Sequence, residues 1–152
     1  MIKKILNFHH ARAGGQTEKM KKIASEKICP FCPKYLAKYH DAPIEKKGRY
    51  WAVTKNDYPY EGSKWHFLFI HRRHIEQASQ ITGPAFSELS QHLKYLIKKY
   101  KLPAGGFFMR FGDSDYTGAT VIHLHAHLIV GGPRNKKTKP LEAPLGYKIQ
   151  KK

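Results

Sequence analysis

Three histidines occupy alternate positions in the segment VIHLHAHLIV, with small aliphatic residues between them: His123, His125 and His127. Residues two apart lie on the same face of an extended strand. The alternation therefore predicts a strand over residues 121–130, with three imidazoles on one face and an apolar face packed on a helix. A buried polar group without a partner costs about 1–3 kcal/mol, so the imidazoles must find hydrogen bonds, a metal or a ligand.

Three interpretations of this histidine face differ in the chemistry they predict. It could be a half-exposed strand that happens to carry polar residues, or a three-histidine metal site like those of hydrolytic zinc enzymes. A flat strand fans alternating rings apart, however, so that one ion would readily reach only two of them. The third interpretation is a polyanion site. Imidazole is a nucleophile near neutral pH and can donate protons, and both properties serve phosphoryl or nucleotidyl transfer.

The segment HLHAHLI resembles the histidine-triad signature of the HIT family of nucleotide hydrolases and transferases, in which histidines alternate with apolar residues. NDYPYEGSKWHFLFIHRRHI and YTGAT are similar to two further segments of that family, so that the resemblance spans residues 50–133. It implies an α+β, HIT-like fold: roughly five antiparallel strands, a long helix on one face and a short N-terminal helical segment.

The resemblance also implies roles for the histidines. His125 would be the nucleophile that attacks the α-phosphorus and forms a nucleotidyl-imidazole, which water or another acceptor then resolves. The carbonyl of His123 would hold the Nδ1–H of His125, leaving its Nε2 free to attack. His127 would face a phosphate oxygen or the leaving group and could supply its proton. His66 would line the same pocket, although an apolar strand could also hold it as a core histidine.

Nucleotide-binding residues follow from the same resemblance. Thr120 would bind a phosphate oxygen and Asn56 the ribose hydroxyls of a purine nucleotide, either a dinucleoside polyphosphate or a nucleoside phosphoramidate. One position departs from the pattern: Gly112 stands where relatives often place an asparagine or glutamine on the phosphate. Asp113 or Ser114 could take that role, or it could be vacant.

The chain's two cysteines, Cys29 and Cys32, form a Cys-x-x-Cys pair in CPFC. Redox chemistry would require a preceding strand, which the sequence does not suggest, and a disulfide is rare in a reducing compartment. Zinc needs two further ligands. Some HIT proteins, and the related galactose-1-phosphate uridylyltransferases, are similar in combining such a pair with two histidines. This resemblance implies a structural zinc held also by His74 and His123, with His71 as a competing ligand.

The elements that must position these residues are visible in the sequence. A mobile start precedes a basic helix near residues 17–27, and a short helix covers residues 33–40 with Pro33 in its first turn. Strands are expected over residues 49–56, 64–72 and 106–113. A helix begins at TGP and buries one apolar stripe at helical spacing: Phe86, Leu89, Leu93, Leu96, Ile97 and Tyr100. We expect an extension over residues 1–28, a HIT domain over 29–133 and a basic tail over 134–152.

The net charge of +17 is concentrated at the two ends of the chain. Residues 1–49 carry twelve basic and four acidic residues, and residues 134–152 carry seven and one. Basic ends favour polyanions, so the alternative to an enzyme is a zinc-stabilised nucleic-acid-binding protein, or an enzyme acting on nucleotides at nucleic-acid ends. Tyr35, Tyr39, Tyr50, Trp51 and Tyr147 would be available for stacking. We expect a cytoplasmic protein with no membrane partner, and dimerisation as in many relatives.

Overall fold

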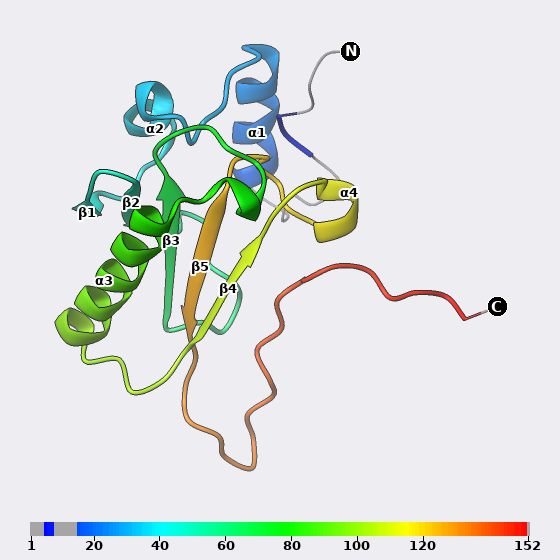
Figure 1. Ribbon diagram of the computed structural model, residues 1–152. Coiled ribbons are helices and arrows are strands. Elements are labelled where there is room, and N and C mark those ends of the chain that lie inside the picture. Colours follow the sequence, from blue (N-terminus) through cyan, green and yellow to red (C-terminus); the bar gives the residue numbers. More distant parts are fainter. Residues whose placement is uncertain (1–4, 8–14, 152) are drawn as a thin grey trace.

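A five-stranded sheet forms the centre of the structure, a computed structural model that describes residues 5–7 and 15–151. Its strands are β1 (Ile44–Lys47), β2 (Trp51–Lys55), β3 (Trp65–His71), β4 (Gly106–Arg110) and β5 (His125–Val130). They lie in the order β1-β2-β3-β5-β4, and every neighbouring pair is antiparallel (Figure 1). The predicted α+β class with a five-stranded antiparallel sheet is confirmed.

The long helix α3 (Gly83–Tyr100) covers one face of this sheet (Figure 1). Thr82 caps its first turn, its hydroxyl accepting a hydrogen bond from the Ala85 N–H. The predicted apolar stripe is only partly correct, because Phe86 is 51% and Ile97 44% exposed. The helix face that packs on the sheet includes a small residue and a histidine. Its buried residues are Ala85, Leu89, His92 and Leu96.

The two faces of the sheet have different functions because side chains alternate along each strand. On the α3 side, apolar residues of three strands form the main core with Leu89 and Leu96: Trp51, Val53, Phe67, Phe69, Leu124, Ala126 and Leu128. The opposite face carries a smaller apolar cluster under α2 (Pro33–Tyr39), together with the polar residues His66, His125 and His127. The fold thus keeps the histidine face clear of its long helix.

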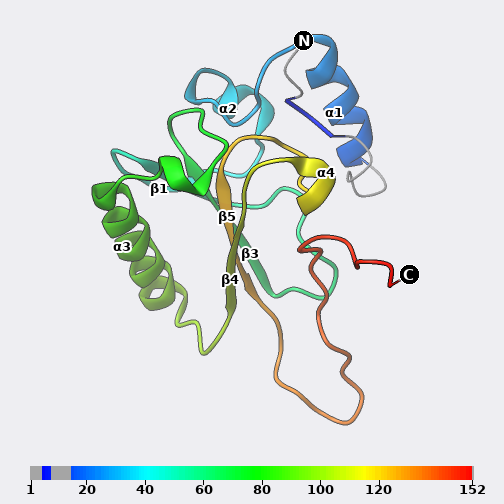
Figure 2. The same ribbon diagram turned by 45° about the vertical axis from the view of Figure 1, so that its right-hand side comes forward.

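The N-terminal segment is more firmly attached than the sequence suggested. Leu6 forms a bridge with Val121, and the Asn7 N–H donates to the carbonyl of Thr120. The buried Asn7 side chain donates to the Ser114 hydroxyl at 2.9 Å. The expectation of a mobile start is therefore wrong for residues 5–7, and residues 8–14 lie outside the described residues. Helix α1 (Gly15–Ser25) follows and lies beyond one end of the sheet (Figure 2).

Several element boundaries differ from the predicted ones. Strand β1 was not predicted, because its sequence IEKK is charged and three of its four residues are exposed. The segment after β4 contains a short helix that was not predicted, α4 (Ser114–Thr117), capped by Asp113. Residues 131–151 form neither helix nor strand. Among the described helices, none combines the length and apolar character needed to cross a bilayer.

Candidate active site and metal centre

The alternation of the three histidines continues across the start of strand β5, as the sequence predicted. Strand β5 begins at His125, and His123 lies in a bend just before it. Leu124 packs with Ala126 and Leu128 in the core on the α3 side, and the rings of His123 and His125 both contact Phe31 on the opposite side. The rings of His125 and His127 have centroids 4.9 Å apart.

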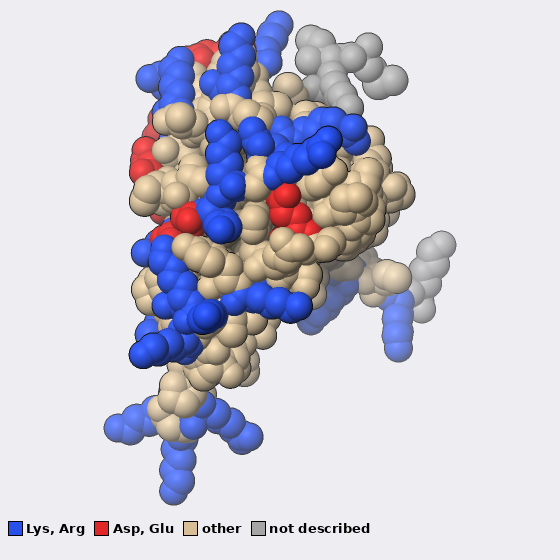
Figure 3. All heavy atoms as spheres, turned by 60° about the vertical axis from the view of Figure 1, so that its left-hand side comes forward, with Lys and Arg blue, Asp and Glu red and all other residues tan. Residues whose placement is uncertain are grey.

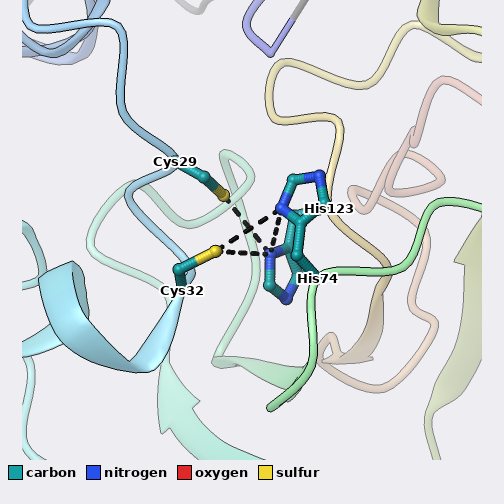
Figure 4. Close-up of side chains that lie close together, drawn as sticks. All are labelled: Cys29, Cys32, His74 and His123. Atoms are coloured by element: carbon teal, nitrogen blue, oxygen red, sulfur yellow. Dashed lines mark hydrogen bonds between the residues drawn. The ribbon is translucent and has the colours of Figure 1, made fainter.

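His123 instead joins Cys29, Cys32 and His74 in a compact four-residue cluster (Figure 4). Its Nδ1 lies 3.3 Å from the Cys29 sulfur, 3.8 Å from the Cys32 sulfur and 3.2 Å from His74 Nδ1. A tetrahedral zinc with Zn–S of about 2.3 Å and Zn–N of about 2.0–2.1 Å would hold its ligand atoms about 3.3–3.8 Å apart. These three separations fit ligands of one tetrahedral metal ion, and all four ligand atoms lie within 4.8 Å of one another.

Hydrogen bonds on the far side of both imidazoles direct their lone pairs into this cluster. His123 Nε2 donates to the carbonyl of His71 at 2.5 Å, and His74 Nε2 lies 3.3 Å from a Glu76 carboxylate oxygen. In the neutral rings both Nδ1 atoms are then unprotonated and face each other, an arrangement that a cation would stabilise. Metal-binding histidines usually make such outer hydrogen bonds. The side chain of His71 is instead bonded to the carbonyl of Arg73 at 2.8 Å and lies outside the cluster.

The metal cluster is coupled to His125 through one backbone carbonyl. His125 Nδ1 donates to the carbonyl of His123 at 2.7 Å, which places its remaining lone pair on Nε2. No described residue forms a hydrogen bond with that Nε2. Burial, opposed by the His123 carbonyl and assisted by the positive charge of Arg110, lowers the pKa of His125 to about 4. His125 is therefore a neutral imidazole at physiological pH, with a free nucleophilic nitrogen.

His66 and His127 form a hydrogen-bonded pair beside His125. His66 Nε2 and His127 Nδ1 are 2.8 Å apart, and the Tyr60 backbone N–H donates to His66 Nδ1. The Asn56 amide nitrogen also lies 3.2 Å from His66 Nε2. His66 is thus a buried member of its strand whose ring contacts both Asn56 and His127.

A pocket opens over His125 and His127 on the face of the sheet opposite α3. Asn56 and Thr120 both line it, together with residues from α1 and β4. Its interior has room of about 60 Å³, which is enough for several water molecules at about 10–15 Å³ each. A phosphate group fits into a space of this size. Lys19 at the rim is already paired with Asp41 and Asp57.

Gly112 has no side chain that could bind a phosphate, and the two residues suggested in its place, Asp113 and Ser114, are engaged elsewhere. The Asp113 carboxylate caps α4 by accepting from the Asp115 N–H at 2.8 Å, and the Ser114 hydroxyl is buried against Asn7. Neither belongs to the described lining of the pocket. Gly112 has a φ of +77°, in the left-handed region that favours glycine, so the backbone itself disfavours a side chain there.

Arg110 is the pocket residue that sequence reasoning missed. It ends β4, directly opposite His125, and its Nη2 lies 3.1 Å from His127 Nε2. The register offered a signal, because a residue that pairs with His125 in an antiparallel sheet lies on the same face. The sequence alone did not show which residues of β4 and β5 would pair.

The surface gives little support to nucleic-acid binding. Of the aromatic residues considered for stacking, Trp51 and Tyr39 are buried, whereas Tyr147 is 61% exposed. Lys and Arg side chains are spread over the face shown in Figure 3, with acidic side chains between them. This distribution does not form a single basic track along that face.

We expect the metal-free protein to lose stability in acid. Burial lowers the pKa of His123 to about 3 and of His125 to about 4, and also lowers the pKa values of the buried His71 and His92. In the unfolded chain these groups return to a pKa of about 6.5. The unfolded state then binds more protons below that pH and is favoured. Urea unfolding with a chelator should give a falling free energy from pH 7 to pH 4.5, and a constant value would contradict this.

Comparison with known proteins agrees with this geometry. The sequence model of the HIT domain matches residues 61–134. No curated protein matches the chain by sequence.

Among solved structures, a HIT family hydrolase from Clostridium thermocellum is similar with a TM-score of 0.56 and 22% identity, over 74% of this chain and 96% of that one. A hypothetical histidine triad nucleotide-binding protein from Sulfolobus tokodaii has a TM-score of 0.55 and 22% sequence identity, and the match covers 79% of this chain and 81% of that one. A Zn-bound histidine triad family protein from Mycobacterium smegmatis has a TM-score of 0.53 and 15% identity, and the match covers 76% of this chain and 83% of that one. At these identities the solved structures establish a shared fold.

Proposed function

From the HIT domain that this chain carries over residues 61–134, we infer that the protein is a nucleotide hydrolase or nucleotidyltransferase acting at an α-phosphate. The single observation that carries the proposal is the state of His125. Its Nδ1 proton is held by the His123 carbonyl at 2.7 Å, and it lines a pocket of phosphate size with Nε2 unbonded to any described residue. A neutral imidazole fixed in this tautomer is an activated nucleophile.

The reaction proceeds by double displacement. Nε2 of His125 attacks the α-phosphorus, forming a P–N bond while the P–O bond to the leaving group breaks and its electron pair departs with that oxygen. His127, which lines the same pocket, stabilises the new negative charge. Water then attacks the same phosphorus, the P–N electron pair returns to Nε2, and the proton of water is released to solvent. Another acceptor in place of water would make the same intermediate serve nucleotidyl transfer.

The substrate is a purine nucleotide with a phosphoanhydride, such as a dinucleoside polyphosphate, or a nucleoside phosphoramidate. Thr120 and Asn56 lie in the pocket lining as a phosphate and a ribose ligand would require. The narrow interior accepts the phosphate and leaves the base toward the mouth, so the choice of base depends on the rim.

The cation of the four-residue cluster is structural zinc. Two cysteines and two imidazoles are a ligand set that zinc prefers, and four protein ligands leave no position for a reactive water. Cys29 and Cys32 would bind zinc as thiolates, and burial raises the pKa of the metal-free Cys29 thiol to about 12. With the ion bound, the ring and the carbonyl of His123 would be held in place, and that carbonyl would orient His125.

The metal cluster and the edge of the sheet indicate where the domain begins and how two copies could associate. Because Cys29 and Cys32 contribute to the cluster, we place the start of the HIT domain at residue 29, with the basic segments 1–28 and 134–152 outside it. Strand β4 lies at the edge of the sheet, and Phe107 on it is 38% exposed. This open edge is available for a two-fold dimer in a cytoplasmic protein.

Acid quenching of a reaction with a radiolabelled dinucleoside polyphosphate tests the mechanism. We expect an acid-labile, base-stable nucleotidyl label on the protein that maps to the peptide containing His125. A panel of dinucleoside polyphosphates and phosphoramidates, assayed on the same zinc-quantified sample, identifies the preferred substrate. Turnover of a panel member with no label on the protein would overturn the covalent intermediate, and absence of turnover across the panel would overturn the proposed enzyme class.

A further inference from the structure

Arg110 lies in the pocket with unused hydrogen-bonding capacity. Its Nη1 donates to the carbonyl of Pro144 at 3.0 Å and its Nη2 to the Tyr60 hydroxyl at 3.2 Å. Its Nε is buried and has no hydrogen-bond partner among the described residues. Within the same part of the chain, no carboxylate forms an ion pair with it, in contrast to Lys19, which is paired twice. A guanidinium has five N–H donors, so most of its binding capacity remains available.

The surroundings fix the position of this guanidinium. It lies over the ring of Phe108, with 5.6 Å between its central carbon and the ring centroid. The Pro144 carbonyl and the Tyr60 hydroxyl hold its two terminal nitrogens from different parts of the chain. A donor held in this way needs little rearrangement to bind an anion, as electrostatic stabilisation of a transition state requires.

Arg110 also lies beside the histidines of the pocket. It pairs with His125 across the sheet, so both side chains lie on the same face and line the same pocket. Its Nη2 is 3.1 Å from His127 Nε2. The guanidinium is therefore next to the nitrogen that would attack the phosphorus.

An anion that enters this pocket would accept hydrogen bonds from the unused donors of Arg110 and offset its positive charge. We propose that Arg110 binds the phosphate that leaves when His125 attacks, and so selects phosphoanhydride over phosphoramidate substrates. This inference rests on the proposed function. Arg110 thus supplies the phosphate contact that Gly112 lacks, from β4 rather than from the turn.

The chemistry of the leaving groups explains the selectivity. When a phosphoanhydride is cleaved, the leaving phosphate oxygen departs with an added negative charge, which Arg110 stabilises without transferring a proton. When a phosphoramidate is cleaved, the leaving nitrogen must gain a proton, and a guanidinium does not supply one because it is not deprotonated in proteins. Arg110 therefore accelerates the first reaction more than the second.

Replacing Arg110 tests this selectivity with two substrates, diadenosine tetraphosphate and adenosine 5′-phosphoramidate. Arg110→Gln should lower kcat/KM for the tetraphosphate by about 100-fold, the cost typical of removing one such donor. For the phosphoramidate the loss should stay below about 10-fold, and Arg110→Lys should recover part of the tetraphosphate activity. Arg134→Gln, which removes an exposed charge from the tail, is the matched control and should leave both rates unchanged. Unfolding temperature and metal content verify that each variant is folded.

Calorimetric binding of pyrophosphate gives a readout that does not depend on turnover. Wild-type protein should bind it, and Arg110→Gln should weaken binding at least about 10-fold, as expected when a charge-assisted hydrogen bond is lost. Equal losses for both substrates would overturn the selectivity, and unchanged rates and binding would overturn the phosphate contact itself. Weaker pyrophosphate binding in a protein whose wild type turns over neither substrate would support the contact and reject the proposed function instead.

Discussion

His125→Ala should lower turnover of the preferred nucleotide by at least about 10³-fold, the scale expected when a covalent nucleophile is removed. His125 contributes the nitrogen that forms the bond to phosphorus, and no other described imidazole is positioned to take over this function. The two ring nitrogens of His127 contact His66 and Arg110, and the Nδ1 of His123 lies beside the cysteines. Initial rates over a range of substrate concentrations should show the loss in kcat, with no nucleotidyl label after acid quenching.

The variant should keep its fold and its metal. Its side chain contributes no atom to the four-residue cluster, whose ligand atoms lie within 4.8 Å of one another. Metal analysis and thermal unfolding should therefore give values close to those of the wild type. His92→Ala is the matched control, because it removes a buried histidine of α3 from the other side of the molecule. That variant should retain its activity per folded molecule, and residual activity of His125→Ala above about 10% of wild type would exclude the nucleophilic role.

The sequence predicted the pieces of the site better than their relative positions. Alternation of histidine with leucine and alanine predicted that Ala126 and Leu128 would pack on the α3 side, and both are in the core. It also predicted that the three imidazoles would share one face, and the rings of His123 and His125 do both contact Phe31. The alternation alone could not predict that the strand begins only at His125, or that His123 meets Cys29, Cys32 and His74, which are distant in sequence.

Long-range pairing accounts for the other differences as well. Arg110 was missed because its importance comes from lying opposite His125, a register that depends on the turn around Gly112 and on α4. Phe86 and Ile97 satisfied the helical spacing of a buried stripe, yet the helix is rotated so that His92 faces inward. An apolar period predicts that a helix has a buried face, whereas the neighbouring side chains decide its exact limits. Local pattern therefore identified the elements, and tertiary contacts determined which residues meet.

Cys29→Ala should remove the metal and lower the unfolding temperature together. A ligand that binds only the folded state at about 1,000 times its Kd stabilises it by about 4 kcal/mol. In a chain of this size that corresponds to a fall of about 8–16 °C. The cluster joins the CPFC turn to residues from two later segments, so its loss frees the N-terminal part from the sheet. Metal analysis and calorimetry, with and without added zinc, should show that the variant no longer responds to zinc.

Activity of Cys29→Ala separates the two roles assigned to neighbouring histidines. If zinc acts only by holding His123, turnover measured below the unfolding temperature should fall by about 10–100-fold, the loss expected when an outer contact of a metal site is disturbed. The nucleotidyl label should still form on His125. Wild-type protein treated with chelator should match the variant in both rate and unfolding temperature. Loss of zinc from His125→Ala to the same degree would show that the two histidines share one function. Unchanged activity in Cys29→Ala would instead show that the carbonyl of His123 orients His125 without the metal.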